Sequence, residues 1–498
     1  MDAIASLTAA VPGDPLEALA RPPEGVAAVE VRVDLLPSLD PATAVATCPL
    51  PLLLTYRSTS EGGQGSNDPS ERRRVITRAH ESGAALLDLE MDRDAPLLAE
   101  LGLDRERVVL SWHDPTRTPE SLAKKAAEML ATGVRWAKVI PTTHSLRDLA
   151  AVLRLHGTFN RDKPEKRRLI TFGMGSAGLP SRFLAPLVGP ELTYVAWNEG
   201  AAAAPAQLTL AEMQAVIGHL SGPPRRIYGV VGQDAHRSLS PRLHGAAYRA
   251  LDLPYVFLPI SAPVAEELSS LFRPRGEGIL DMPGAEVFGL AVTTPYKEVA
   301  VRAASVVAPR ARRARSANTL LFKERQILAD TTDADGVVGS LVAAGMDPQG
   351  VTVVVQGTGG AARAAAIGLD LAGAQVFLRG RDPERTRRVA EELELRYSKP
   401  GKVPERTRIL VNATPLGLAA GDPSPFSPEE VSRAEAVVDM VYGRGISELA
   451  RLSRAAAARY ISGREILFFQ GVVQFLAMTG RQPPREVMRR AISIPPAS

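Results

Sequence analysis

Lys138 lies inside an apolar run, residues 136–140, that has the composition of a buried strand. Burial makes an ammonium group costly and favours the neutral amine, which can attack a ketone. The imine that forms then acts as an electron sink. The residues alone leave a second interpretation equally open, in which the stem of Lys138 is buried and its ammonium reaches water.

Other polar side chains could complete such a site. His113 ends a different apolar run and suits a general base, because imidazole titrates near neutral pH. Glu61 could orient that imidazole. Arg32, Arg57 and Arg182 carry planar forks that match a carboxylate and hydroxyl groups.

Eight short apolar runs with helical stretches between them would position these residues: 4–7, 29–32, 52–56, 86–90, 108–112, 136–139, 169–172 and 192–195. Repeated strand–helix units predict a parallel sheet, and eight of them predict a closed (β/α)8 barrel. Six of the runs end in, or are closely followed by, unusual polar residues. That placement matches a barrel active site, which lies at the C-terminal ends of the strands.

The order of these motifs resembles type I 3-dehydroquinate dehydratase across about residues 1–220. The resemblance rests on residues 30–34, 55–58, 61–63, 88–90, 111–114, 138, 174–176 and 181–182. It implies that Lys138 forms a Schiff base with 3-dehydroquinate. It also implies that His113 moves the protons and that four residues hold the substrate: Glu30, Arg32, Arg57 and Arg182.

The stretch 203–207 resembles the lid of that family, in which Gln207 would contact the substrate. Ala203 stands where the family has serine, and Ala206 where it has glycine. These departures remove one hydroxyl contact and stiffen the loop. They bear on substrate affinity more than on the chemistry, which depends on Lys138 and His113.

A second candidate site follows the β-branched run 351–356, which leads into a glycine-rich turn and a helix start: Gly357, Thr358, Gly359, Gly360 and Ala361. Glycines there let a pyrophosphate approach the helix N-terminus. The next strand, 375–378, is followed by Arg379 and Arg381, with Arg385 a further candidate. Arginine at this position favours the 2′-phosphate of NADP, whereas the neighbouring Asp382 points towards the ribose hydroxyl of NAD.

Polar clusters across about residues 226–490 together resemble shikimate dehydrogenase. They lie at 238–241, 293–297, 316–319, 331–333, 411–417, 439–442 and 463–470. The resemblance implies that Lys297 and Asp333 form a catalytic pair, which supplies a proton and a positive charge to the alkoxide formed from a reduced ketone. It assigns substrate binding to Ser238, Ser240, Thr293, Asn318, Tyr442 and Gln470, and further cofactor contacts to Asn412, Thr414 and Gly463.

Two departures from this second family stand near the pair. Arg237 replaces a histidine, and Thr331 replaces the asparagine of an Asn-Thr-Asp motif. Asp333 remains, so the assignment stands. Asp335, two residues further on, is the alternative carboxylate.

The composition excludes several classes of protein. A net charge of +4, from 59 basic and 55 acidic residues, is too small to indicate nucleic-acid binding, and the basic stretch 310–315 has no interleaved aromatic residues. We read that stretch as a solvated helix face that could also attract anionic substrates. One cysteine, Cys48, gives no disulfide framework, and the scattered histidines give no metal cluster. No leader or membrane-spanning segment is evident, so we expect a cytoplasmic protein.

The sequence thus predicts an α/β chain with three parts: a dehydratase barrel over 1–222, a substrate-binding domain over 227–325 completed by helices in 465–498, and a Rossmann NADP-binding domain over 326–464. The predicted function is conversion of 3-dehydroquinate to 3-dehydroshikimate and its reduction to shikimate with NADPH, without a metal. The alternatives are a second half that uses quinate with NAD, a metabolite sensor without turnover, and one active half beside an inactive one. The expected partners are small molecules, and a homodimer is left open.

Overall fold

The computed structural model describes residues 2–160, 167–190, 192–273, 275, 278, 280, 286–399, 402–443 and 445–494. They group into two compact units. The first holds the residues up to Arg226 together with Pro254–Glu267, and the second holds most residues from Ile227 onward. Among the described residues, no helix combines the length and apolar character needed to cross a bilayer.

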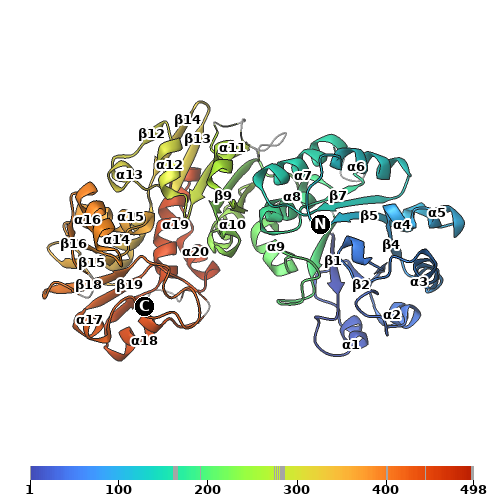
Figure 1. Ribbon diagram of the computed structural model, residues 1–498, viewed down its shortest axis with the longest axis horizontal. Helices are drawn as coiled ribbons and strands as arrows, with labels where there is room; N and C mark the ends of the chain where they lie inside the picture. The colour runs from blue at the N-terminus through green and yellow to red at the C-terminus, as the bar shows by residue number, and fades with distance from the viewer. Residues whose placement is uncertain are drawn as a thin grey trace. The chain divides into compact units, whose positions relative to one another are not determined.

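Parallel strands of the first unit form one nearly closed barrel sheet, drawn in blue to green in Figure 1. In the described chain this sheet has eight strands in the order β7-β6-β5-β4-β3-β2-β1-β8, and the two outer strands, β7 and β8, are not hydrogen-bonded to each other. The strands are β1 (Asp2–Leu7), β2 (Ala28–Arg32), β3 (Leu52–Thr55), β4 (Leu86–Glu90), β5 (Val108–Asp114), β6 (Trp136–Pro141), β7 (Leu169–Thr171) and β8 (Leu192–Ala196). All eight predicted strands are therefore present.

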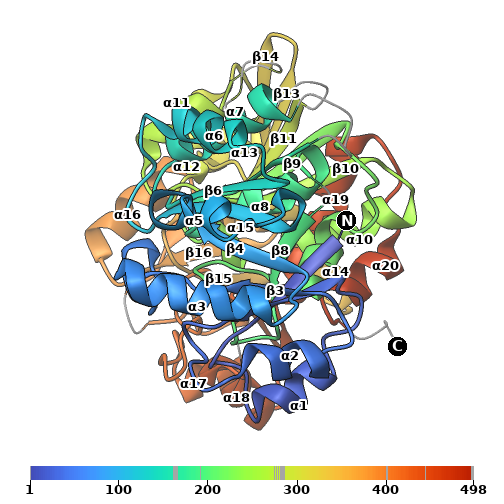
Figure 2. The same cartoon turned by 90° about the vertical axis from the view of Figure 1, so that its right-hand side faces the viewer.

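Helices cover the outside of this sheet. They are α1 (Pro15–Ala20), α2 (Pro41–Thr47), α3 (Pro69–Glu81), α4 (Met91–Asp94), α5 (Leu97–Glu100), α6 (Leu122–Ala131), α7 (Leu146–Phe159), α8 (Leu179–Val188) and α9 (Leu210–Ile217). Asp14, Asp40 and Asp68 each cap a helix whose first residue is proline, so local sequence sets where these helices begin. In Figure 2 strands β3, β4 and β6 lie between α6 and α7 on one side and α2 and α3 on the other.

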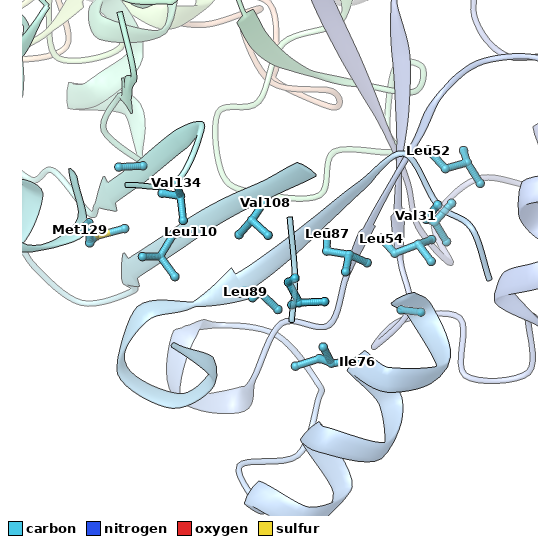
Figure 3. Close-up of a cluster of buried hydrophobic side chains, with 14 of the residues drawn as sticks. Val31, Leu52, Leu54, Ile76, Leu87, Leu89, Val108, Leu110, Met129 and Val134 are labelled. Atoms are coloured by element: carbon cyan, nitrogen blue, oxygen red, sulfur yellow. The ribbon is translucent and has the colours of Figure 1, made fainter. Parts of the chain in front are cut away.

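Alternation along each strand separates the outer core from the barrel interior. Leu87 and Leu89 of β4 join an apolar cluster with Ile76 of α3 and Met129 of α6 (Figure 3). A smaller apolar cluster includes Ile4, Ala28, Leu53, Val109, Ile170 and Tyr194. Some of its members, such as Tyr194, also line the cavity that holds the polar side chains.

A second, mixed sheet has the order β10-β9-β11-β13-β14-β12. Its strands are β9 (Arg226–Gly232), β10 (Tyr255–Ser261), β11 (Glu286–Val292), β12 (Val306–Val307), β13 (Thr319–Lys323) and β14 (Gln326–Asp330). Its helices are α10 (Ser240–Ala250), α11 (Leu268–Leu271), α12 (Lys297–Ala303) and α13 (Pro309–Ala314). The basic stretch lies in and just after α13, and three of its arginines pair with acids: Arg310 with Asp330 and Asp335, Arg313 with Asp370, and Arg315 with Glu392.

A third sheet is parallel throughout, in the order β17-β16-β15-β18-β19-β20. Its strands are β15 (Thr352–Gln356), β16 (Gln375–Arg379), β17 (Arg396–Tyr397), β18 (Thr407–Asn412), β19 (Ala436–Asp439) and β20 (Arg459–Ile461). The helices of this part are α14 (Asp333–Ala343), α15 (Gly360–Leu371), α16 (Pro383–Glu392), α17 (Pro428–Arg433) and α18 (Glu448–Ala455). This is the doubly wound sheet that the sequence predicts.

The C-terminal residues form α19 (Gly463–Thr479) and α20 (Arg485–Ala491), in agreement with the predicted helical tail. Helix α19 packs closely on α14, because α14 presents Gly336 at the contact. A Cβ at Gly336 would lie 2.8 Å from the carbonyl oxygen of Ile466 and 3.1 Å from Cβ of Gln470. This close approach brings a polar side chain of α19 to the N-terminal end of α14.

Candidate active sites

A cavity of about 300 Å³ opens inside the barrel. Its walls include all eight residues that the sequence assigns to this site: Glu30, Arg32, Arg57, Glu61, His113, Lys138, Arg182 and Gln207. They meet because the C-terminal ends of parallel strands share one edge of the barrel.

Lys138 is 3% exposed, and its nearest charged partner is a carboxylate that the sequence interpretation left out of the site. Its Nζ donates a hydrogen bond of 2.6 Å to Oδ2 of Asp88. Burial alone would raise the pKa of Asp88, but the charges of Arg57 and Lys138 hold it below its usual value. Nζ of Lys138 is thus paired with a carboxylate, a contact that opposes the loss of charge that burial by itself would favour.

His113 and Glu61 form the second polar pair of the cavity. Nδ1 of His113 lies 3.0 Å from Oε2 of Glu61, which also accepts the backbone N–H of His113. Burial, followed by the charges of Arg57, Lys138 and Arg32, holds the pKa of His113 well below its ordinary value. Burial also raises the pKa of Glu61 to about 8, although Arg57 opposes that shift. In the neutral tautomer that donates from Nδ1 to Glu61, the lone pair lies on Nε2, where it can act as a base.

The three arginines of the site differ in how many of their N–H donors are already bonded to other protein groups. Arg57 bonds to Glu61, Glu90 and Asp88, so it organises carboxylates instead of presenting an open fork. The fork of Arg32 is likewise used, by both oxygens of Asp34.

Arg182 keeps most of its donors. It gives one hydrogen bond, of 3.3 Å, to the carbonyl of Pro205, and its Nε has no partner among the described residues. Burial lowers the pKa of Arg182 to about 10. Of the three predicted arginines it is therefore the best placed to bind a carboxylate.

The lid is tied to the barrel through Gln207. Its Oε1 accepts the N–H of Ala203 at 2.6 Å, and its Nε2 lies 3.3 Å from Oγ of Ser6, which donates to Glu30. Ala206 has φ of 57°, in the left-handed region that glycine adopts more readily. Ser6 is not among the predicted site residues, although the alternation of side chains along β1 places it on the inward face of the strand.

The second site is built on two helix starts. Lys297 is the first residue of α12 and Asp333 the first of α14, where the helix N-terminus stabilises a carboxylate. Nζ of Lys297 donates to Oδ2 of Asp333, and Nδ2 of Asn318 donates to Oδ1 at 2.9 Å. Asp335 instead pairs with Arg310, so Asp333 is the one of the two candidate carboxylates that contacts Lys297.

Most of the predicted substrate-binding residues of this half cluster in two places. Nδ2 of Asn318 also lies 2.7 Å from Oε1 of Gln470, so Gln470 joins the Lys297–Asp333 pair. Ser238 hydrogen-bonds to Tyr442, whose pKa is raised by burial, and accepts the N–H of Ser240. Thr293 follows β11, where its methyl group fills the space left by Gly232: a Cβ there would lie 2.3 Å from it.

The glycine-rich turn lies directly against Lys297 of the Lys297–Asp333 pair. A Cβ at Gly360 would lie 2.9 Å from Cβ of Lys297, and one at Gly357, whose φ is 131°, would lie 2.8 Å from the carbonyl of Ala413. A Cβ at Gly359 would meet nothing within 4 Å. The turn therefore leaves open space at the N-terminus of α15, beside Thr358 and Ala361, and fits a dinucleotide pyrophosphate there.

At the end of β16, the two predicted phosphate-binding arginines differ in whether they are already paired. Arg379 donates hydrogen bonds to Gln356 and Glu430, so its guanidinium group is not free to bind a phosphate. Arg381 is exposed, and Asp382 caps α16 by accepting the N–H of Arg385 at 3.1 Å. A cavity of about 590 Å³ lies at this strand end.

Two other predicted cofactor residues, Asn412 and Gly463, constrain the conformation of nearby loops. Asn412 is fully buried, and its side chain bonds to Thr414 and Asp439. Gly463 is required sterically, because a Cβ there would lie 2.5 Å from the carbonyl of Val441. Within the described parts of the chain, no group of three or more His, Cys, Asp or Glu side chains is arranged to hold a metal.

Comparison with known proteins assigns both halves. Residues 4–222 match the family described as type I 3-dehydroquinase, residues 230–320 the shikimate dehydrogenase substrate binding domain, and residues 463–492 the shikimate 5′-dehydrogenase C-terminal domain. The bifunctional 3-dehydroquinate dehydratase/shikimate dehydrogenase of Arabidopsis thaliana is 28% identical over 94% of this chain and 80% of its own length.

Two further proteins are similar to this chain. The NADP(+) shikimate dehydrogenase of Methanothrix thermoacetophila is 33% identical over 54% of this chain and 96% of its own. The solved dehydroquinate dehydratase and shikimate dehydrogenase of S. pombe is 21% identical, with a TM-score of 0.44, and covers 99% of this chain and 98% of its own.

Proposed function

This chain belongs to the shikimate dehydrogenase family through its second half and carries a type I 3-dehydroquinase domain in its first, and we propose that it is a bifunctional dehydroquinate dehydratase and shikimate dehydrogenase. The first activity eliminates water from 3-dehydroquinate to give 3-dehydroshikimate. The second reduces that ketone to shikimate. The two reactions are consecutive, which accounts for their presence on one chain.

In the barrel, the ammonium of Lys138 releases a proton and its amine adds to the substrate ketone. The ketone oxygen then leaves as water with two of the three nitrogen protons, which gives an iminium ion. Nε2 of His113 takes a proton from the adjacent carbon, and the freed electron pair moves towards the iminium nitrogen. The protonated imidazole then gives its proton to the departing hydroxyl group, and hydrolysis of the imine releases the product. Arg182 supports binding of the substrate carboxylate because its donors are largely unused.

In the second half, a dinucleotide held at the turn from Gly357 to Ala361 would supply the hydride that reduces the ketone. Lys297 gives the developing alkoxide a proton and a nearby positive charge, and Asp333 holds the ammonium in place. Asn318, bonded to Asp333 and Gln470, positions the carboxylate. Ser238, Ser240, Thr293 and Tyr442 offer hydroxyl groups to the ring hydroxyls and carboxylate of the substrate.

We assign the dinucleotide as NADP(H), with no metal. Arg381 supports this choice, since it is exposed at the end of β16, where an arginine meets a 2′-phosphate. The turn from Gly357 to Ala361 would receive the pyrophosphate.

The observation that carries the proposal is that one chain holds two separate lysine–carboxylate pairs, one inside a barrel cavity and one against a glycine-rich turn. A coupled assay tests it. Wild-type protein given 3-dehydroquinate and NADPH should oxidise the nucleotide. Lys138→Ala should abolish this with 3-dehydroquinate and keep it with 3-dehydroshikimate, whereas Lys297→Ala should accumulate 3-dehydroshikimate. No oxidation by the wild-type protein with either acid would refute the proposal.

A second candidate keeps the dehydratase and replaces the second activity with NAD-dependent oxidation of quinate. Asp382 favours it, because a carboxylate at this strand end suits a free ribose hydroxyl. Rates with NADP and NAD on shikimate and on quinate distinguish the candidates, and a higher kcat/KM for quinate with NAD would select the second.

A further inference from the structure

Tyr194, on β8, lies in the dehydratase cavity and has no role in the mechanism above. It is 5% exposed, and its ring lines the cavity. Nζ of Lys138 lies 4.5 Å from the centroid of this ring, within the range of a cation–π interaction. Its buried hydroxyl group has no hydrogen-bond partner among the described residues. The ring, rather than the hydroxyl, is therefore the part of Tyr194 that meets the lysine.

Asp88 meets the same nitrogen from another strand. Its Oδ2 accepts the 2.6 Å hydrogen bond from Lys138, while its Oδ1 accepts Oγ of Ser111 at 2.5 Å and Nη2 of Arg57 at 2.7 Å. Three donors thus fix this carboxylate, so it cannot turn away from the lysine. The nitrogen of Lys138 is held between a fixed anion and the electron-rich face of an aromatic ring.

Both contacts favour a positively charged nitrogen, yet attack on the ketone needs a neutral amine. The proton count of Schiff-base formation reconciles the two. An ammonium group and a ketone give an N-protonated iminium and one water, because two of the ammonium protons leave with the ketone oxygen. The nitrogen therefore carries one positive charge both before and after the covalent bond forms.

We propose that Asp88 and the ring of Tyr194 form a cradle that keeps the nitrogen of Lys138 cationic through the dehydratase reaction, as ammonium in the resting site and as iminium in the covalent intermediate. The proton that His113 removes becomes acidic only while the imine nitrogen stays protonated. The cradle then acts on the proton-transfer step and not on the binding of the substrate carboxylate. This inference rests on the dehydratase function proposed above.

Other charged groups share the cavity and set the background for any pH measurement. They come from β2, the segment after β3, β5 and α8: Glu30, Arg32, Arg57, Glu61, His113 and Arg182. Each of the variants below leaves these six in place. Tyr194→Leu removes no charge and so isolates the ring, whereas Asp88→Asn also changes the charge that acts on Arg57 and Glu61.

The test is the pH dependence of kcat for the dehydratase reaction, whose alkaline limb reports groups in the enzyme–substrate complex. Tyr194→Leu removes the aromatic face, so the iminium loses its proton at lower pH. We expect the limb to move down by about one pH unit, a roughly tenfold change in the protonation equilibrium of the iminium, which is the size expected from the loss of one desolvated cation–π contact. Tyr194→Phe keeps the ring and should leave the limb in place. It should also unfold at the same or a higher temperature, because it removes a hydroxyl group without a partner.

Asp88→Asn provides a second route if Tyr194→Leu does not fold, and should move the limb in the same direction. Borohydride trapping of the adduct, followed by mass mapping, adds a readout independent of turnover: the trapped fraction at alkaline pH should fall in both variants. A limb unmoved in both Tyr194→Leu and Asp88→Asn overturns the cradle, as does an equal shift in Tyr194→Phe. Absence of any trapped adduct in the wild-type protein would instead overturn the dehydratase function itself.

Discussion

Asp382 gives the sharpest prediction about the cofactor. Its carboxylate caps α16 through the N–H of Arg385, at the strand end where the 2′-phosphate of NADP would lie beside Arg381. Asp382→Asn removes the negative charge and keeps the cap, since asparagine and aspartate cap helices about equally well. The stability of the protein should therefore stay the same, and any effect should fall on the cofactor.

The size of that effect follows from Coulomb's law. In water, unit charges about 6 Å apart interact by about 0.7 kcal/mol, so a doubly charged phosphate gains about 1.4 kcal/mol when Asp382 is neutralised. This corresponds to roughly tenfold tighter binding of the phosphorylated nucleotide. Because the site is exposed, salt should weaken the effect, and most of it should disappear near 1 M ionic strength.

Calorimetric titration with 2′,5′-ADP and 5′-AMP measures this directly and does not depend on turnover. Asp382→Asn should tighten 2′,5′-ADP about tenfold and leave 5′-AMP within a factor of two. Arg381→Ala serves as the opposite control and should weaken 2′,5′-ADP selectively. Equal affinities of the Asp382→Asn and wild-type proteins for 2′,5′-ADP at low salt would show that this carboxylate does not face the 2′ position.

Three further predictions concern the catalytic groups and the turn. Because the pKa of His113 is held well below its ordinary value, the neutral base persists on acidification, and kcat/KM for dehydration should stay flat from pH 7 to 6; a fall with a midpoint near 6.5 would contradict this. Asp333→Asn should lower kcat of the dehydrogenase about 100-fold, whereas Asp335→Asn, whose carboxylate pairs elsewhere, should retain it within about threefold; similar losses in both would refute the assignment. Gly360→Ala should destabilise the protein by about 1–3 kcal/mol in denaturant unfolding because the new Cβ meets the catalytic lysine, while Gly359→Ala should leave stability unchanged; equal stabilities would show that the turn can shift.

The barrel could be predicted from the sequence because its strands are short and apolar, and six of the eight runs end in, or are closely followed by, unusual polar residues. The structure differs from the prediction at the strand ends: β5 and β6 run two residues further, to Asp114 and Pro141, while β7 stops at Thr171. These differences depend on hydrogen bonds between neighbouring strands, such as the one from the N–H of Thr142 to the carbonyl of Asp114. A strand's own residues do not specify such a partner.

The candidate sites were predictable to the extent that chemistry follows from residue type. Lys138, His113 and Glu61 meet as expected, but their electrostatics depend on Asp88. A signal for Asp88 was present, since it precedes Glu90 by two residues and period-two alternation puts both on the inward face. No comparable signal could show that the donors of Arg57 are already taken by acids from other strands.

In the second half too, residue type alone does not show which charged side chains are already paired. Arg379 and Arg381 are equivalent in sequence as phosphate ligands, yet one is engaged by Gln356 and Glu430 and the other is exposed. Asp333 and Asp335 are equivalent as partners of the catalytic lysine, and again only three-dimensional pairing distinguishes them. Sequence therefore identifies which charged groups gather at a site. Which of them remain available to a ligand is decided by neighbours distant in the chain, because every buried charge must first find its own partner.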